Sequence, residues 1–434
     1  MYVIPPIKKN YCLQRTYSDK DPDIVNVPIS LLCKEFGTFL HLYTTMDPTK
    51  ISLDLMRHVQ MLVIEMAKIY KKEESRKNVL LYLLKKFFNQ PIVPENNTDG
   101  CIVYSVNGCN IAALIMEAKK EECSTNYDPV MQALDYYTQF ISKYVKETAS
   151  TNRRCCPCIV VTICGPNMRV LGIVNQATSI VYECLVPTLK LAYIPGSHIS
   201  NSICFCMAAL KATVDSLHVY YSTTPNSISS NFPYFCSYQS NVGEFGNGEK
   251  LEIQYISQLQ RLVYSAMIVA NTTTKVKAIV KFTEVYGTAA HKYMANEEYS
   301  PKILHIEELK PKWIVIIMEK WELTKIKDSN LVPQLRLAIN KLHEKGFVHG
   351  DLRPDNVFTT NGSIAIIDFD WAGETNKAKY PLWMNPIHDW PQNAAPGQYI
   401  TKEHDNYWID FLEKSLTSTW PDTSRASSDR TSPP

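Results

Sequence analysis

The chain has 434 residues, of which 45% are hydrophobic and 20% are charged, and its formal net charge is +2. Two domains are expected, because a chain of this length exceeds what one hydrophobic core usually serves. The small net charge excludes a global field that attracts nucleic acid, so any affinity for it would need a local basic patch. The 13 cysteines are an odd number, which predicts thiols in a reducing compartment rather than a disulfide framework.

The N-terminal residues MYVIPPIKKNYCLQR lack the apolar run of a signal peptide, and no window holds the roughly 18 uninterrupted apolar residues of a membrane helix. We therefore expect an intracellular protein of the cytoplasm or nucleus with no membrane partner. The predicted fold class is α+β with two domains. The predicted segments are an N-terminal extension (1–50), a first domain (51–221), a linker (222–250), a second domain (251–415) and a disordered tail (416–434).

The first half combines helical and alternating patterns. Apolar residues at helical spacing mark 52–88, and two alternating runs joined by Asn107-Gly108 predict a β-hairpin over 101–116. The further predicted elements of this half are a helix over 129–144, strands over 158–164, 170–174 and 179–186, and a helix over 202–217. Strands interleaved with helices predict a mixed α/β domain.

Acidic residues gather at the ends of that hairpin. Asp99 opens the first strand, and Glu117-Ala118-Lys119 closes the second. An Asp followed by E-x-K on the adjacent strand is the arrangement of metal-dependent nucleases of the PD-(D/E)XK type. Strand alternation places Glu117 and Lys119 on one face beside Asp99. We expect the two carboxylates and the Ala118 carbonyl to hold Mg²⁺, with Lys119 orienting the attacking hydroxide.

Two further features support the nuclease interpretation. Gln132 and Tyr136 form Q-x-x-x-Y, one turn apart on a common helix face. Glu73 or Glu74, on the preceding helix, would complete the acidic set, and Glu74 is the stronger candidate for an indirect role. The competing interpretation is that EAKKEE is only a solvated charge run at a strand end.

The second half has a different order of elements. The patterns predict strands over 251–257, 261–270 and 278–282, a helix over 286–296, strands over 302–306 and 312–319, and a helix over 333–345. Five strands interrupted by one helix, followed by a helix that leads into a polar loop, is the order found in protein kinases. We therefore expect a bilobal protein-kinase-like domain.

The polar loop and the hairpin after it carry the residues of phosphoryl transfer from ATP. In HGDLRPDN, Asp351 occupies the position of the catalytic base and Asn356 the first metal position, and Asp368 of IDFDWAG occupies the second metal position. Arg353 replaces the usual Lys and keeps a cation near the transferred group. Gly350 stands where an Arg would hold a phosphorylated activation loop, so control by that route is not expected.

Nucleotide contacts are predicted upstream of this loop. Lys281 in AIVKF corresponds to the Lys that contacts the ATP phosphates, and Met318 and Glu319 fit the segment that contacts the adenine edge. No glycine lies between Leu251 and Lys281, so a glycine-rich phosphate loop is missing. The sequence leaves open which residue pairs with Lys281; the candidates are Glu284, His291, Glu297 and Glu298.

From about residue 25 to 415 the chain resembles the crinkler-type effectors of fungi and oomycetes, which fuse a restriction-endonuclease-like domain to a protein-kinase-like domain. The resemblance rests on the segments LIMEAKKE, IVKFTEVYGTAAHKYM, HGDLRPDN, IDFDWAGE and KEHDNYWI. It implies nucleic acid as the substrate of the first half, a protein hydroxyl as that of the second, and delivery into a host cell. The N-terminus lacks the effector trafficking header, so a resident intracellular homologue is the alternative.

The leading hypothesis is an ATP- and Mg²⁺-dependent Ser/Thr protein kinase fused to a nuclease-like domain. In a second hypothesis the kinase half is a degenerate binding module and the nuclease half carries the activity, which the missing glycines favour. A third is a small-molecule phosphotransferase, because such enzymes also combine HGD with a residue other than glycine after DF. The sequence does not indicate an oligomeric state.

Overall fold

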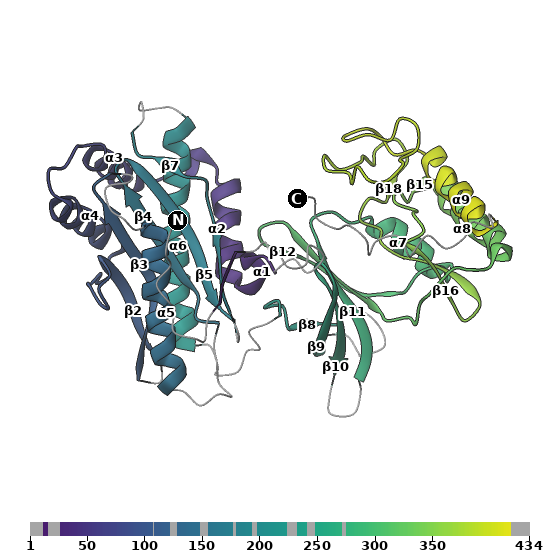
Figure 1. Cartoon of the computed structure of the whole chain (residues 1–434), viewed down its shortest axis with the longest axis horizontal. Helices are drawn as coiled ribbons and strands as arrows, with labels where there is room; N and C mark the ends of the chain where they lie inside the picture. Colours follow the sequence, from purple (N-terminus) through teal and green to yellow (C-terminus); the bar gives the residue numbers. More distant parts are fainter. Residues whose placement is uncertain are drawn as a thin grey trace, which may run out of the picture. The chain divides into compact units, whose positions relative to one another are not determined.

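The computed structural model describes residues 12–15, 27–106, 108–121, 128–147, 155–176, 179–192, 198–223, 232–240, 248–270 and 275–417. Parts of the predicted N-terminal extension and linker, and the predicted disordered tail from residue 418 onward, lie outside these residues. The chain divides into two compact units (Figure 1). The first is Met1–Tyr238 with Lys250–Leu262 and Glu308–Lys312, and the second is Gln239–Glu249, Val263–Glu307 and Trp313–Pro434.

A mixed β-sheet forms the centre of the first unit, with strand order β1-β6-β5-β4-β3-β2 and β7 beside β5. Its strands are β1 (Cys12–Arg15), β2 (Gly100–Val106), β3 (Cys109–Lys119), β4 (Cys158–Cys164), β5 (Asn167–Asn175), β6 (Ser179–Cys184) and β7 (Leu189–Lys190). Strands β2 and β3 form the predicted hairpin, and β3 pairs with β4 in parallel. A parallel pair needs a long crossover, which the intervening helix supplies.

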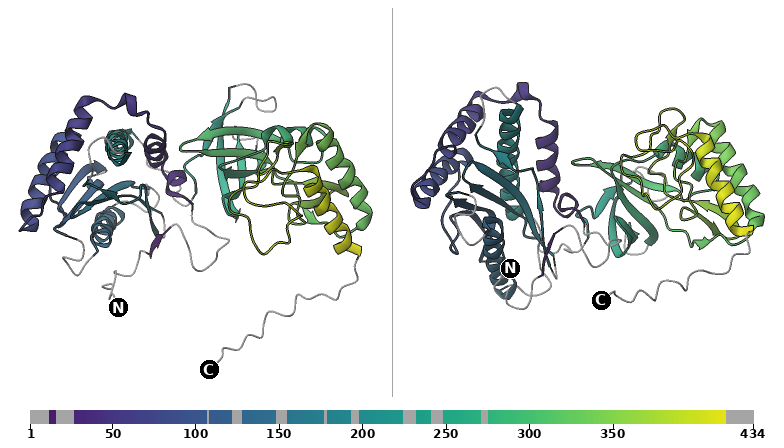
Figure 2. Two further views of the ribbon diagram at one scale, coloured as in Figure 1. Left: turned by 90° about the horizontal axis from the view of Figure 1, so that it is seen from above. Right: turned by 45° about the horizontal axis from the view of Figure 1, so that its top comes forward.

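Helices cover both faces of this sheet. They are α1 (Ile29–Leu32), α2 (Lys34–Thr45), α3 (Leu53–Met66), α4 (Glu73–Phe88), α5 (Pro129–Glu147) and α6 (His198–Thr223), with a 3₁₀ turn, η1, at Pro48–Lys50. Helix α5 packs on β3 and β4, whereas α6 contacts α2, α3, β2 and β3 from the other face (Figure 2). By length and composition Ser200–Thr223 of α6 could span a membrane, but half of it is buried within the protein.

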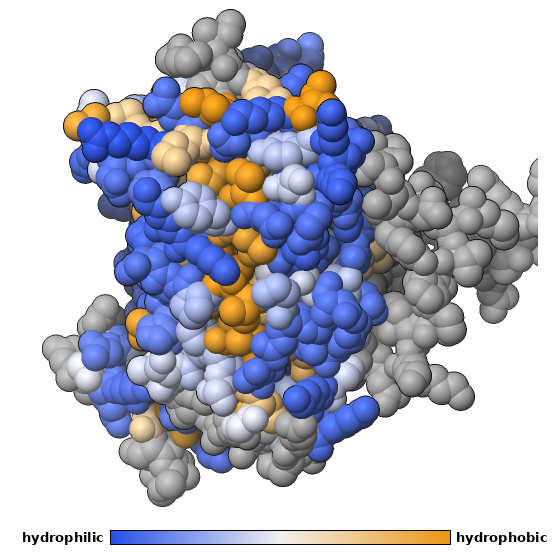
Figure 3. Space-filling view, turned by 90° about the vertical axis from the view of Figure 1, so that its left-hand side faces the viewer, coloured by the Kyte–Doolittle hydropathy of each residue, from blue (hydrophilic) through white to orange (hydrophobic). Residues whose placement is uncertain are grey.

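The structure refines the predictions for this unit in two places. The helical pattern over 52–88 is present as two helices, since α3 ends at Met66 and α4 starts at Glu73. Residues 27–45, for which the sequence predicted no element, form α1 and α2, and α2 buries Phe36 and Phe39 completely. Figure 3, which faces the side where α3 and α4 lie in Figure 1, shows a band of hydrophobic surface between hydrophilic side chains.

The second sheet has the strand order β12-β13-β11-β10-β9-β8. These strands are β8 (Ser237–Gln239), β9 (Lys250–Gln260), β10 (Val263–Val269), β11 (Lys275–Thr283), β12 (Ile303–Leu309) and β13 (Trp313–Glu319), with α7 (Thr288–Asn296) inserted after β11. The predicted order of five strands with one helix is therefore present. The chain turns from β9 to β10 through two residues, Arg261 and Leu262, and Leu262 has a φ of +57°.

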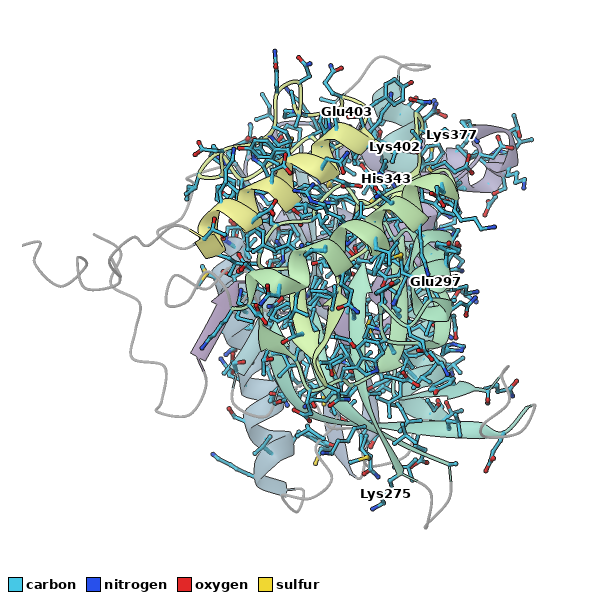
Figure 4. All side chains as sticks on the ribbon, turned by 90° about the vertical axis from the view of Figure 1, so that its right-hand side faces the viewer. Lys275, Glu297, His343, Lys377, Lys402 and Glu403 are labelled. Atoms are coloured by element: carbon cyan, nitrogen blue, oxygen red, sulfur yellow. The ribbon has the colours of Figure 1, made fainter. Side chains whose placement is uncertain are left out.

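The remaining part of the second unit is rich in helix. It contains β14 (Thr324–Lys325), η2 (Ser329–Leu331), α8 (Val332–Glu344), β15 (Phe347–Val348), β16 (Val357–Thr360), β17 (Ser363–Ile366), β18 (Gly373–Glu374) and α9 (Lys402–Thr417). Helices α8 and α9 lie side by side, with His343 near the end of α8 and Glu403 near the start of α9 (Figure 4). Leu335 and Ile339 of α8 pack with Phe369 and Trp408 in one buried core. Leu352 of the loop 349–356 belongs to the same core, which holds the loop against α8 and α9.

Candidate active site

A buried carboxylate holds the start of the polar loop in place. Asp405 on α9 is completely buried, and its Oδ2 accepts hydrogen bonds from the His349 amide at 2.8 Å and from His343 Nε2 at 2.9 Å. Its Oδ1 accepts from the Gly350 amide at 2.9 Å. Backbone N–H groups at this depth need such partners. Asp405 therefore fixes the loop against α8 and α9.

Gly350 is required by the local backbone. Its φ is +82°, a conformation that residues with a side chain rarely adopt. A Cβ atom there would lie 2.7 Å from Ile400 Cδ1 and 3.2 Å from the Trp371 carbonyl oxygen. The sequence showed only that Gly350 replaces a regulatory Arg. The structure adds a steric reason why this position is glycine.

Asp351 lies at the centre of a polar cluster. Arg353 donates to both of its oxygens, from Nε to Oδ1 at 2.5 Å and from Nη2 to Oδ2 at 2.9 Å. Asn356 Nδ2 donates to Asp351 Oδ2 at 2.9 Å and to its backbone oxygen at 2.8 Å. Three predicted residues are therefore in direct contact. The hydrogen bond to Asp351, the largest cause, raises the pKa of Arg353.

The guanidinium of Arg353 has further partners that the motif gave no sign of. Its Nη1 donates to His388 Nε2 at 2.6 Å, so this histidine accepts through Nε2 and carries its proton on Nδ1. The same guanidinium lies 5.6 Å from the ring centre of Trp390. Both residues come from a segment more than thirty positions downstream, and only the fold brings them to Arg353.

Lys281 pairs with two aspartates of the DFD triplet. Its Nζ lies 2.8 Å from Asp368 Oδ1 and 2.7 Å from Asp370 Oδ1. Burial alone would raise the pKa of Asp368, but the Lys281 ammonium lowers it overall. The pKa of Asp370 is raised to about 6, mainly by burial. The sequence predicted Asp368 as a metal ligand and Lys281 as a nucleotide contact, and it did not predict that the two residues pair.

None of the four partners that the sequence offered for Lys281 pairs with it in the described structure. Glu297 instead accepts from Lys341 Nζ at 2.6 Å. His291 Nε2 donates to the Pro301 carbonyl at 2.8 Å, and its Nδ1 accepts from the Tyr286 hydroxyl at 2.6 Å. Burial lowers the pKa of His291 to about 4, so this imidazole is neutral and both of its nitrogens are bonded.

Met318 and Glu319 end strand β13. The side chain of Met318 is 9% exposed, and the Glu319 amide donates to the Lys302 carbonyl at 3.0 Å. Glu319 Oε2 accepts from the Lys302 amide and from Trp321 Nε1, each at 3.2 Å. Both residues thus have roles in holding the strand end, and their predicted contact with adenine remains a prediction.

A second polar cluster lies in the first unit, where β2 begins and β3 ends. Asp99 Oδ2 accepts from the Ala118 amide at 2.8 Å, and Glu117 Oε1 accepts from the Asp99 amide at 3.2 Å. Glu117 is completely buried, and its Oε2 has no hydrogen-bond partner. Burial, and then the Asp99 carboxylate, raises the pKa of Glu117 to about 8. A buried carboxylate oxygen without a hydrogen-bond donor is unusual, and a positive charge is the kind of group that satisfies it.

Two lysines contact these acids. Lys119 Nζ lies 3.4 Å from Glu73 Oε1 and 3.8 Å from Glu117 Oε2. Lys77 Nζ lies 3.2 Å from Asp99 Oδ1. The sequence suggested no role for Lys77 at this site, because α4 had no fixed position relative to the hairpin.

Only some of the supporting contacts predicted for this cluster are present. Glu73, rather than Glu74, reaches Lys119, whereas Glu74 is two-thirds exposed and lies 3.8 Å from Lys77. Gln132 Nε2 donates to the Tyr136 hydroxyl at 2.6 Å, so this pair is in contact. Among the residues that the structure describes, no group of three or more His, Cys, Asp and Glu side chains has a metal-binding arrangement. The carboxylates that could hold a cation in this cluster are those of Asp99 and Glu117.

The comparisons with known proteins concern the second half of the chain. The protein kinase domain family matches residues 255–390, a range that contains Lys281, Asp351, Asn356 and Asp368. Among solved structures, the Cydia pomonella granulovirus kinase PK-1 is 14% identical, with 39% of this chain and 69% of that chain covered and a TM-score of 0.31. Vaccinia related kinase 3 is 12% identical, with 43% and 68% covered and a TM-score of 0.33. The family match identifies residues 255–390 as a protein kinase domain.

Proposed function

We propose that this domain transfers the γ-phosphoryl group of ATP to a Ser or Thr hydroxyl of a protein. One observation carries the proposal: Asp351 is held by Arg353 and Asn356 in the loop that the family uses for catalysis. A carboxylate fixed in this way accepts the proton of the attacking hydroxyl while the new oxygen–phosphorus bond forms and ADP leaves. Arg353 offsets the negative charge that develops beside it.

The residues present fit Mg²⁺-ATP. The Asn356 amide nitrogen donates to Asp351, which leaves its amide oxygen as the atom for a cation. Asp368 uses Oδ1 toward Lys281 and has a second oxygen. Asn356 and Asp368 would thus hold the metal with hard oxygen ligands, and Lys281 would contact the phosphates. The bound metal would supply charge neutralisation at the phosphates.

The nucleotide site has a direct test in thermal stability. Mg²⁺-ATP at a hundredfold excess over its Kd is expected to stabilise the wild type by about 2.7 kcal/mol, which raises its Tm by several degrees. Asp368→Ala is expected to lose this increase, because an oxygen ligand is removed. The control is Asp410→Ala, an exposed side chain on α9 that pairs with Arg336 and should leave the increase intact. Differential scanning fluorimetry with and without nucleotide measures both.

Nucleotide stabilisation and acceptor specificity together distinguish the three hypotheses. A wild type that millimolar Mg²⁺-ATP does not stabilise would favour the binding module over the kinase. Phosphate transfer to aminoglycosides or choline, but not to a Ser/Thr peptide library, would favour the small-molecule phosphotransferase. Transfer to the peptides supports the proposed specificity.

A second candidate function belongs to the first unit. We propose a Mg²⁺-dependent nuclease site at Asp99, Glu117 and Lys119, which is favoured by Glu117 Oε2, a buried oxygen with no hydrogen-bond donor and only Lys119 Nζ, at 3.8 Å, as a nearby cation. Asp99, Glu117 and the Ala118 carbonyl would hold the cation, and Lys119 would orient the water that attacks the phosphodiester. Lys77 would have to release Asp99 for this, so it competes with the metal for the carboxylate.

Glu117→Gln separates this proposal from a structural role. We expect it to reduce plasmid or RNA cleavage in Mg²⁺ at least about 100-fold and to weaken Mg²⁺ binding measured by calorimetry, because one anionic ligand is lost. Asp135→Asn, an exposed acid on α5 that accepts a hydrogen bond from Gln139, is the matched control and should change neither measurement. Equal cleavage by the wild type and Glu117→Gln would remove Glu117 from catalysis.

Together the two sites support a wider role. We infer that the chain acts as a crinkler-type effector, with its kinase acting on host protein and its first unit on host nucleic acid. Expression in host cells of the wild type, Asp351→Asn and Glu117→Gln tests this. Toxicity lost in either variant supports the role, and equal effects of all three chains contradict it.

A further inference from the structure

The triplet after the hairpin β16–β17 reads Asp368-Phe369-Asp370, and its last residue forms an ion pair with Lys281. Asp370 is a carboxylate at a position where the usual kinase triplet has glycine. Its Oδ1 lies 2.7 Å from Lys281 Nζ. The Lys281 side chain is only 11% exposed, so its ammonium is held between the two aspartates rather than in bulk water. In the proposed reaction Asp370 is neither the catalytic base nor a metal ligand.

Lys281 lacks a carboxylate from the side where kinases usually supply one. The usual partner is a Glu on the helix after the lysine strand. Here that helix is α7, and its central buried polar residue is His291. The His291 ring stacks on Phe369 with centres 4.6 Å apart and planes at 4°, and both of its nitrogens are hydrogen-bonded elsewhere. A neutral imidazole in this position cannot form the ion pair.

We propose that Asp370 is the residue that positions Lys281 for the nucleotide, in place of a glutamate on α7. Asp368 Oδ1 accepts one of the three N–H groups of the ammonium, and Asp370 Oδ1 lies 2.7 Å from the same nitrogen as an ion-pair partner, so donor capacity remains for a phosphate oxygen. With Asp368 as a ligand of a divalent cation, Asp370 would be the counter-charge that keeps Lys281 in place. Without Asp370, the lysine would follow Asp368 or lose its fixed direction.

This inference rests on the proposed kinase function and extends it. It also accounts for the combination of an acidic triplet end with a helix that has no glutamate at the usual position. Asp370 does not contact the reacting atoms in this scheme. It acts through Lys281, so its removal should impair nucleotide binding in a way that a loss of folded protein cannot imitate.

The experiment compares Asp370→Asn, Asp370→Gly and the double variant Asp370→Gly/His291→Glu in steady-state transfer to a peptide acceptor. Asp370→Asn and Asp370→Gly are expected to raise the KM for ATP roughly tenfold, because the ion pair that holds the lysine is lost. A smaller active fraction lowers kcat but cannot raise KM. The double variant places a carboxylate on α7 and should lower KM again toward that of the wild type. Asp389→Asn, an exposed change in the same unit, is the matched control.

The outcomes separate the two claims. An active wild type whose KM for ATP does not change in Asp370→Asn overturns the positioning role alone. A wild type with no transfer and no stabilisation by Mg²⁺-ATP overturns the proposed kinase function and this role with it. Should the double variant fail to fold, the Asp370→Asn value still decides, since this change keeps the side-chain volume.

Discussion

Asp351→Asn is expected to slow phosphoryl transfer by about 10²–10⁴-fold, the range that general-base catalysis contributes. The amide has nearly the same shape, but it cannot accept the proton of the attacking hydroxyl. Arg353 and Asn356 both donate to the Asp351 carboxylate, so the new amide also loses part of its hydrogen bonding. The measurement is kcat with a peptide acceptor, alongside the Kd of Mg²⁺-ATP, which is expected to change little because the proposed role of Asp351 is toward the acceptor hydroxyl.

Asp355→Asn is the matched control for this change. Asp355 lies in the same loop, is two-thirds exposed and pairs with Lys325 Nζ at 2.5 Å. Its removal should leave kcat within about twofold, since exposed ion pairs contribute little. Full turnover in Asp351→Asn would show that another group takes the proton and would contradict the base assignment.

Residues of the candidate site that lie within one short segment could be predicted from the sequence. Asp351 and Asn356 share a loop, and their contact follows from a spacing of five residues in a fixed turn. Lys281 lies 87 residues before Asp368, and its partner depends on how two distant segments pack. Sequence reasoning looked for that partner on α7 and at its two ends, but His291 of α7 stacks on Phe369 instead.

The fold shows the same division between local and tertiary information. Alternation and a turn signal located the β2–β3 hairpin, but the long buried run of β3 reflects its place inside the sheet beside β4. Helix α2 went unpredicted because its mixed composition becomes meaningful only when Phe36 and Phe39 are buried. Glu73 was not distinguished from Glu74, since adjacent residues of a helix point about 100° apart and only the packing of α4 decides which one faces Lys119.

Asp405→Ala is expected to have the largest effect on stability, about 3–5 kcal/mol, the cost of removing one member of a buried polar pair. Two buried amides, those of His349 and Gly350, would lose their acceptor, and His343 would lose its own. Water cannot readily replace the carboxylate, because Asp405 is completely buried. A loss of this size should lower the Tm by about 10 °C for a domain of this length.

The effect on catalysis should exceed what unfolding explains. The loop 349–356 begins at the two amides that Asp405 holds, so Asp351 loses its fixed position even in molecules that remain folded. We therefore expect kcat to fall at least about tenfold at a temperature where circular dichroism still shows the native state. Asp410→Ala, on the exposed side of the same helix, separates these effects, because it removes only a surface pair with Arg336. Equal Tm and kcat in both variants would show that the loop keeps its shape without the buried carboxylate.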